Sequence, residues 1–163
     1  MAFLLLFFHF QNIIWRTSKI ITHSRKNNQI NSANFIFAIY EPTDSTGHNK
    51  GFTFNNPKYK EAFKTADLYA YYVIEAIKAR PAYEKEDWLI IITSDHGGIN
   101  TSHGGRSLME MDTPFVIAGK NVKKGGEFSE AMMQYDTAAT IAEAFGLKTP
   151  QLWRGQSMSQ VFE

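Results

Sequence analysis

Two short stretches of the chain concentrate the side chains that could bind a metal ion. The first holds Asp44 and His48, and the second holds Asp95 and His96 with His103 close behind. Two carboxylates and three imidazoles suit a borderline cation such as zinc or manganese better than calcium, which takes oxygen ligands. These five side chains exceed what one open catalytic zinc needs and are about right for two incomplete sites. The residue types therefore predict a centre with two divalent ions, zinc above all.

Such a centre has a definite chemistry. Two ions roughly 3.5–4 Å apart can stabilise both the attacking and the leaving oxygen of a phosphoryl transfer. A cation also lowers the pKa of a bound oxygen nucleophile, to about 7 for zinc-bound water. Taken singly, the first cluster is better explained as an ordinary turn, and a turn that ends a strand also explains the second, because Asp, Ser and Gly favour turns. The metal hypothesis depends on their coincidence, since three of the five histidines of the chain fall in these two segments.

Each cluster follows an apolar run that predicts a buried strand. Residues 34–40 precede Asp44, and residues 88–93 precede Asp95. Continuous apolar runs of this length are typical of strands buried on both faces. The carboxyl ends of such strands are where ligands bind in an open α/β sheet. Asp44 and His48 are four residues apart and can reach one ion whether they lie on a helical turn or in an irregular loop.

A helix is predicted between the two strands. Residues 57–80 carry apolar side chains at steps of three and four, after Asn56 as a cap and before Pro81 as a stop. Strand, helix and strand in this order predict a parallel βαβ unit. Three aromatic residues within the helix are predicted to pack in the core, namely Tyr69, Tyr71 and Tyr72.

Two further elements complete the expected α/β domain. Residues 113–119 predict a third, shorter strand, and a last helix is expected from its cap Asp136 to Phe145, where Gly146 stops it. We therefore expect a partial parallel sheet with flanking helices.

The composition excludes several classes of function. At 163 residues, with 44% apolar and 20% charged residues, the chain is an ordinary globular domain. It has no cysteine, which excludes disulfides, thiolate metal sites and thiol nucleophiles. A net charge of +1 gives no sign of a nucleic-acid duplex as partner.

The first thirty residues differ in character from residues 31–163, which we expect to form the metal-binding α/β unit. An apolar run near the start is followed by basic residues, with no acidic residue before position 41. A signal peptide, an amphipathic anchor in membrane contact through residues 1–20, and an artefact of a mis-set start are the open alternatives. The apolar run is too short for a confident transmembrane helix.

Several motifs resemble those of one enzyme family. Residues 44–51 resemble the D-x-x-G-H-x-x-G string of the nucleotide pyrophosphatase and type I phosphodiesterase family, within the alkaline phosphatase superfamily. Residues 94–97 are similar to the S-D-H-G string of that superfamily. Residues 103–119 resemble its H-G segment and following strand, and residues 135–158 its carboxyl-terminal helix and close.

The resemblance implies a zinc-dependent hydrolase of phosphate esters on a three-layer, alkaline phosphatase-like core. By this resemblance Asp44, His48 and His103 hold one zinc, while Asp95 and His96 help to hold the other. The implied substrate is a small-molecule phosphate ester or nucleotide, and the implied location is periplasmic or otherwise extracytoplasmic.

The resemblance covers only the carboxyl-terminal half of such an enzyme. The family pattern also has an aspartate after the first strand and a Thr or Ser nucleophile at a helix start, and no aspartate precedes Asp44 here. We therefore expect no catalytic nucleophile in this chain, weak or no turnover by the chain alone, and association with a missing amino-terminal half or with itself. Arg106 is the residue that could contact an anionic substrate.

Two alternatives stay open from the sequence. Sulfatases carry a similar S-D-H-G string but use one hard cation and a modified cysteine or serine, and the arrangement of Asp44 and His48 favours the two-zinc branch. A non-catalytic metal-binding fragment is the other alternative, and zinc binding without ester hydrolysis would distinguish it.

Overall fold

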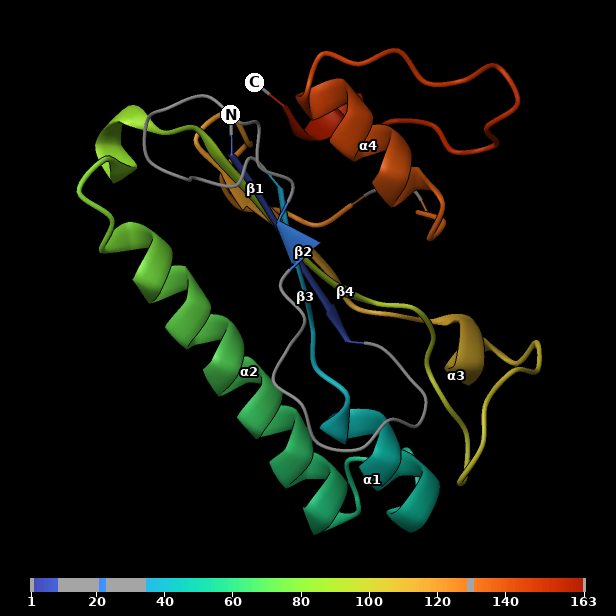
Figure 1. Cartoon of the computed structure of the whole chain (residues 1–163). Coiled ribbons are helices and arrows are strands. Elements are labelled where there is room, and N and C mark those ends of the chain that lie inside the picture. Colours follow the sequence, from blue (N-terminus) through green and yellow to red (C-terminus); the bar gives the residue numbers. More distant parts are fainter. Residues whose placement is uncertain (1, 9–20, 23–34, 129–130, 163) are drawn as a thin grey trace.

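A five-stranded mixed sheet forms the centre of the computed structural model, which describes residues 2–8, 21–22, 35–128 and 131–162 (Figure 1). The strands lie in the order β2, β3, β1, β4, β5. Their bounds are Ala2–Phe8 for β1, Ile21–Thr22 for β2, Phe35–Ile39 for β3, Trp88–Ser94 for β4 and Phe115–Gly119 for β5.

The three inner strands are parallel and the two edges are antiparallel. In β1, Leu5 lies opposite Phe37 of β3 and Ile91 of β4, and both pairings are parallel. Strand β2 runs antiparallel to β3, and β5 runs antiparallel to β4 with Ile117 opposite Ile91. The α/β class is confirmed, and the parallel arrangement expected from the sequence is found in the three inner strands, while both edge strands are antiparallel. Between β4 and β5, residues 95–114 form no helix longer than the four residues of α3. Without a long crossover helix, β5 pairs with β4 in the antiparallel direction.

Within the described residues, four α-helices and two 3₁₀ turns accompany the sheet. Their bounds are Pro42–Lys50 for α1, Pro57–Lys78 for α2, Leu108–Met111 for α3, Asp136–Ala144 for α4, and Tyr83–Lys85 and Ser159–Val161 for the 3₁₀ turns. The predicted cap of α2 is confirmed, because the Asn56 side chain accepts a hydrogen bond from the backbone N–H of Lys58 at 3.0 Å.

The sequence predicts Asp136 as the cap of the last helix, but in the structure Asp136 is already the first residue of α4. Tyr135 occupies the cap position and Asp136 is the first helical residue. The Asp136 carboxylate accepts the backbone N–H groups of Met133 and Gln156, at 2.8 and 2.9 Å. Gly146, with a φ of +66°, follows the helix as predicted.

Helices α2 and α4 cover opposite faces of the sheet, which gives three layers (Figure 1). On one face Ala70 and Ile77 of α2 pack against Trp88, the first residue of β4. On the other face Leu89 and Ile91 of β4 form a core with residues of α4 and its flanks. Alternate residues of β4 thus point to the two faces, as the pleat of a strand requires, and the strand that carries Asp95 is firmly embedded.

The tyrosines of α2 correct a prediction. Their exposed fractions are 51%, 54% and 57% for Tyr69, Tyr71 and Tyr72. The prediction that they pack in the core is therefore wrong. The buried residues of α2 are Ala66, Ala70 and Ile77. The two alanines let the helix lie close to the sheet, and Tyr69, Tyr71 and Tyr72 are exposed.

Residues 2–8, within the segment for which signal, anchor and artefact were open, form the central strand β1. The remaining features predicted for residues 1–30 fall almost entirely outside the described residues and stay predictions. Among the residues that the structure describes, no helix is long and apolar enough to cross a membrane.

Candidate metal centre

Helix α1 presents Asp44 and His48 on one face, one turn apart. Pro42 opens this helix, where its missing N–H costs nothing. Since residues four apart in a helix are neighbours, the His48 Nε2 atom lies 3.2 Å from Asp44 Oδ1. The Asp44 side chain is only 7% exposed, whereas that of His48 is 39% exposed. The pair therefore has a buried carboxylate and an accessible imidazole.

His103 reaches the same point from the long connection after β4. Its Nε2 atom lies 3.1 Å from His48 Nε2 and 3.9 Å from Asp44 Oδ1. The ligand atoms of these three residues all lie within 4.8 Å of one another. One carboxylate and two imidazoles are three protein ligands, the number that leaves an open position on a catalytic zinc.

Backbone carbonyls fix which nitrogen of two imidazoles is available. His48 Nδ1 donates to the carbonyl oxygen of Thr101 at 2.9 Å, and His96 Nδ1 donates to that of Gly97 at 2.6 Å. Because a carbonyl only accepts, the proton of the neutral ring sits on Nδ1, and Nε2 is the nitrogen that carries the lone pair. This is how metal-ligating histidines are usually oriented, so the donor set fits a zinc-type cation.

His103 is held in the neutral form that a metal ligand requires. Burial lowers its pKa first, because the imidazolium is poorly solvated there, and the neighbouring His96 and His48 lower it further. Burial raises the pKa of the Tyr59 phenol, and the negative charge of Asp44 raises it further. Both directions are those expected when imidazoles and a carboxylate crowd into a partly buried site.

Asp95 and His96 lie directly beside this group, where β4 ends. The His96 ring stacks on that of His103 with centroids 3.7 Å apart and planes 26° apart, and His96 Nε2 lies 3.8 Å from Asp95 Oδ1. The structure thus brings together all five residues that the sequence singles out, three in one cluster and two at its side. Their division between two ions stays a prediction.

Sequence reasoning missed Glu110, which orders the connection that carries His103. Its carboxylate accepts the backbone N–H of Gly105 at 2.8 Å and both the N–H and the hydroxyl of Ser107, at 3.2 and 2.5 Å. The Ser107 hydroxyl is the main cause that lowers the Glu110 pKa. The signal was present, since Ser107 and Glu110 form a capping box, whose S-x-x-E spacing is recognisable in a sequence.

Arg106 lies in the same connection and is exposed. Its contact with an anionic substrate stays a prediction.

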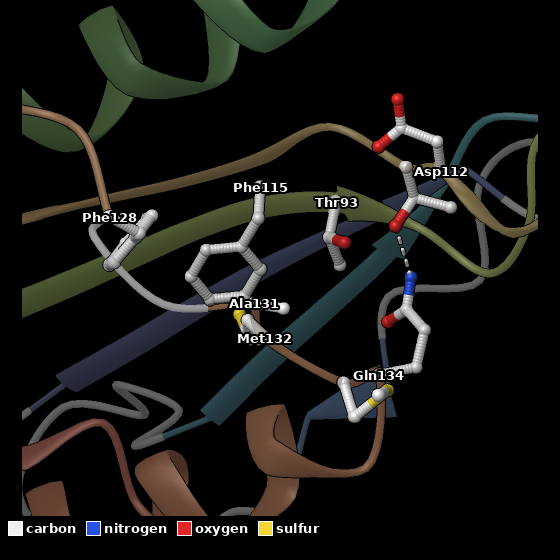
Figure 2. Close-up of a pocket in the computed structure, with 9 residues that line it drawn as sticks. Thr93, Asp112, Phe115, Phe128, Ala131, Met132 and Gln134 are labelled. Carbon is white, nitrogen blue, oxygen red and sulfur yellow. Dashed lines mark hydrogen bonds between the residues drawn. The ribbon is translucent and has the colours of Figure 1, made fainter. Parts of the chain in front are cut away.

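A cavity of about 280 Å³ opens at the end of β4, two residues before Asp95 (Figure 2). Phe115 and Phe128 form its apolar side, and Asp112 and Gln134 contribute polar groups. The Gln134 side chain donates to Thr113 Oγ1 at 2.9 Å and to the carbonyl oxygen of Ser94. Gln134 therefore ties the segment before α4 to the strand end that leads into Asp95.

Comparisons with known proteins agree on one superfamily. A sequence profile described as type I phosphodiesterase / nucleotide pyrophosphatase matches residues 9–147. A phosphopentomutase of Agathobacter rectalis is 35% identical over 74 residues, which are 45% of this chain and 18% of the relative. A phosphopentomutase of Herpetosiphon aurantiacus is 39% identical over 62 residues, 38% of this chain and 16% of the relative.

A solved structure also shares the fold. The crystal structure of a putative sulfatase from Bacteroides thetaiotaomicron matches 74% of this chain and 30% of its own with a TM-score of 0.51 and 19% identity. At that identity the likeness concerns the fold alone. The chain spans less than a fifth of the length of the two phosphopentomutases.

Proposed function

Because the chain belongs to the type I phosphodiesterase / nucleotide pyrophosphatase family, we propose that it provides zinc ligands for a centre that hydrolyses phosphate esters. The profile match confirms the resemblance carried by residues 44–51 and 94–97. The observation that carries the proposal is the convergence of Asp44, His48 and His103, whose ligand atoms lie within 4.8 Å of one another.

Each of these residues has a role that follows from its surroundings. Asp44 supplies a negative charge in a buried position, where an opposite charge is attracted most strongly. His48 and His103 supply nitrogen donors, the first oriented by the Thr101 carbonyl and the second with a pKa that burial lowers, which favours its neutral form. A divalent cation held there would lower the pKa of an attacking oxygen and offset the charge that develops on a phosphoryl group.

Asp95 and His96 are proposed to hold a second cation with a ligand from elsewhere in the protein. Two hydroxyls near the centre are engaged with carbonyls, since Ser45 Oγ donates to Pro42 at 3.3 Å and Ser94 Oγ donates to His96 at 3.2 Å. As the family resemblance implies, the Thr or Ser nucleophile is proposed to come from another part of the enzyme. The substrate class is proposed to be small phosphodiesters, pyrophosphates or nucleotides.

Transfer of a phosphoryl group between sugar hydroxyls is a second candidate function. The observation that favours it is the local identity of 35% and 39% to two phosphopentomutases. The same metal ligands would serve both reactions, and the two differ in whether water or a sugar hydroxyl receives the phosphoryl group.

The proposal is tested by assaying the zinc-loaded protein on bis(4-nitrophenyl) phosphate, 4-nitrophenyl phosphate, 4-nitrophenyl sulfate and a pentose phosphate. We expect slow, zinc-dependent release of nitrophenol from a phosphate ester, lost in His48→Ala and retained in Lys50→Ala, an exposed residue of the same helix. Preferred cleavage of the sulfate would replace the proposal with sulfatase chemistry. Isomerisation of the pentose phosphate without hydrolysis would favour the mutase function, and zinc binding with no reaction would indicate a non-catalytic metal-binding role.

A further inference from the structure

A buried aromatic ring lies between the two segments that carry the metal ligands. Phe52 is only 6% exposed, although it follows the polar end of α1. Its ring centroid lies 5.3 Å from that of His48 and 6.1 Å from that of His103, and both pairs are edge-to-face. Phe52 is thus in contact with an imidazole from each segment.

Two glycines leave the space that this ring occupies. A Cβ atom at Gly47 would lie 2.3 Å from Phe52 Cε1, and one at Gly98 would lie 2.4 Å from Phe52 Cγ. Gly47 belongs to α1 and Gly98 to the connection after β4. Since real Cβ contacts are never this short, a side chain at either position would displace the ring. The ring therefore fits closely between the segments, in the manner of a core residue.

Backbone hydrogen bonds hold the same two segments together at this level. The Phe52 N–H donates to the carbonyl oxygen of Asn100 at 2.7 Å, next to the Thr101 carbonyl that receives His48 Nδ1. Gly51, with a φ of +97°, makes the turn that brings Phe52 into this position. Ring and backbone thus fix the position of α1 relative to the connection that carries His103.

We infer that Phe52 is a positioning residue, which sets the separation of the His48 and His103 imidazoles and thereby the zinc affinity of the centre. The inference deepens the proposed function and rests on it. A ring that packs edge-to-face on both ligands restricts their rotation, so the ligand atoms need little rearrangement when a cation binds. Groups that orient metal ligands typically change metal affinity by about 10- to 100-fold when they are replaced.

The first test compares zinc affinity by calorimetry in the unsubstituted protein, Phe52→Leu and Phe145→Leu. Phe145 packs against the core beside α4, and Phe145→Leu is the control because it removes the same kind of ring away from the metal centre. We expect Phe52→Leu to bind zinc at least about tenfold more weakly and to change the visible absorption spectrum of bound cobalt. We expect Phe145→Leu to lower the melting temperature without changing the zinc affinity or the cobalt spectrum.

A second test moves the ring without removing it. Gly47→Ala gains about 1 kcal/mol of helix propensity but adds a Cβ 2.3 Å from Phe52 Cε1, so we expect it to displace the ring and weaken zinc binding. In the Phe52→Leu background, which lacks the atoms that Gly47→Ala meets first, the same substitution should have a smaller effect on affinity.

The outcomes separate the two proposals. If the unsubstituted protein binds no zinc, the proposed function fails and the inference fails with it. If the unsubstituted protein binds zinc, and Phe52→Leu and Gly47→Ala bind it with the same affinity, the proposed function stands and the role of Phe52 is overturned. The same conclusion follows if Phe145→Leu weakens zinc binding as much as Phe52→Leu does. If Phe52→Leu does not fold, unchanged affinity in Gly47→Ala overturns the inference and weakened affinity supports it.

Discussion

Glu86 connects the end of α2 to the start of β4, and its replacement by glutamine tests the electrostatic stabilisation of the fold. Its carboxylate accepts two hydrogen bonds from the Arg80 guanidinium, at 2.8 and 2.6 Å, and one from the Trp88 indole at 2.8 Å. The Arg80 guanidinium also lies 5.6 Å from the centre of the Trp88 ring. Glu86→Gln keeps the shape of the side chain and removes its charge.

The magnitude follows from the pKa of this carboxyl. The hydrogen bonds from Arg80 are the largest cause that lowers the Glu86 pKa from 4.5 to about 2. A shift of that size corresponds to at most about 3–4 kcal/mol at neutral pH. Because the Arg80 side chain is 36% exposed, screening by solvent reduces this, and we expect a loss of about 1–2 kcal/mol in the free energy of unfolding.

The dependence on pH has a fixed sign. A carboxyl whose pKa is lowered on folding stabilises the fold above its unfolded pKa of 4.5, and this contribution is lost as the pH falls toward 2. The difference between the protein and Glu86→Gln should therefore be full at pH 7 and disappear between pH 4.5 and about 2.

Urea denaturation of both proteins from pH 7 to pH 2.5 measures this difference, with Glu84→Gln, an exposed neighbour, as the control. At pH 7 the expected loss corresponds to a melting temperature lower by about 2–8 °C. A difference that stays constant over the whole pH range, or an equal loss in Glu84→Gln, would refute the assignment of the effect to this ion pair.

Three further substitutions test the site and the core. His48→Ala removes one of three ligand atoms, so zinc affinity in calorimetry should fall by more than about tenfold with an unchanged circular dichroism spectrum; unchanged affinity would exclude His48 as a ligand. Tyr69→Ala removes an exposed ring whose centroid lies 5.2 Å from that of Tyr40. The free energy of unfolding should change by at most about 1 kcal/mol, and the zinc affinity should not change. Weakened zinc binding would contradict the position of Tyr69 outside the site. Ile91→Ala leaves a cavity at a fully buried position and should lower the free energy of unfolding, measured by urea denaturation, by about 2–5 kcal/mol. A loss below about 1 kcal/mol would contradict the place of Ile91 in the core.

The candidate ligands could be picked out from the sequence because their chemistry is visible in single side chains. Asp44 and His48 are four apart and follow a strand, and Asp95 and His96 end another strand. The structure brings the two segments together because β3 and β4 both run parallel to β1, so their carboxyl ends lie at the same edge of the sheet.

Features that depend on distant contacts could not be predicted in this way. The carbonyl of Thr101 orients the imidazole of His48, which lies 53 residues earlier in the sequence, but a backbone carbonyl leaves no trace in the residue type. The antiparallel direction of β5 depends on where the chain returns, not on its apolar pattern. Helix α2 carries aromatic residues on more than one side, so periodicity did not indicate that small residues such as Ala70, and not Tyr69, face the sheet.

The measurement that tests the central claim most directly is anomalous X-ray diffraction at the zinc absorption edge, from crystals of this protein grown with zinc. We predict an anomalous peak about 2.0–2.2 Å from Asp44 Oδ1, His48 Nε2 and His103 Nε2, whose atoms already converge. A second peak beside Asp95 and His96 would support the two-ion centre. Zinc bound only at other residues, with no peak at this cluster, would contradict the account.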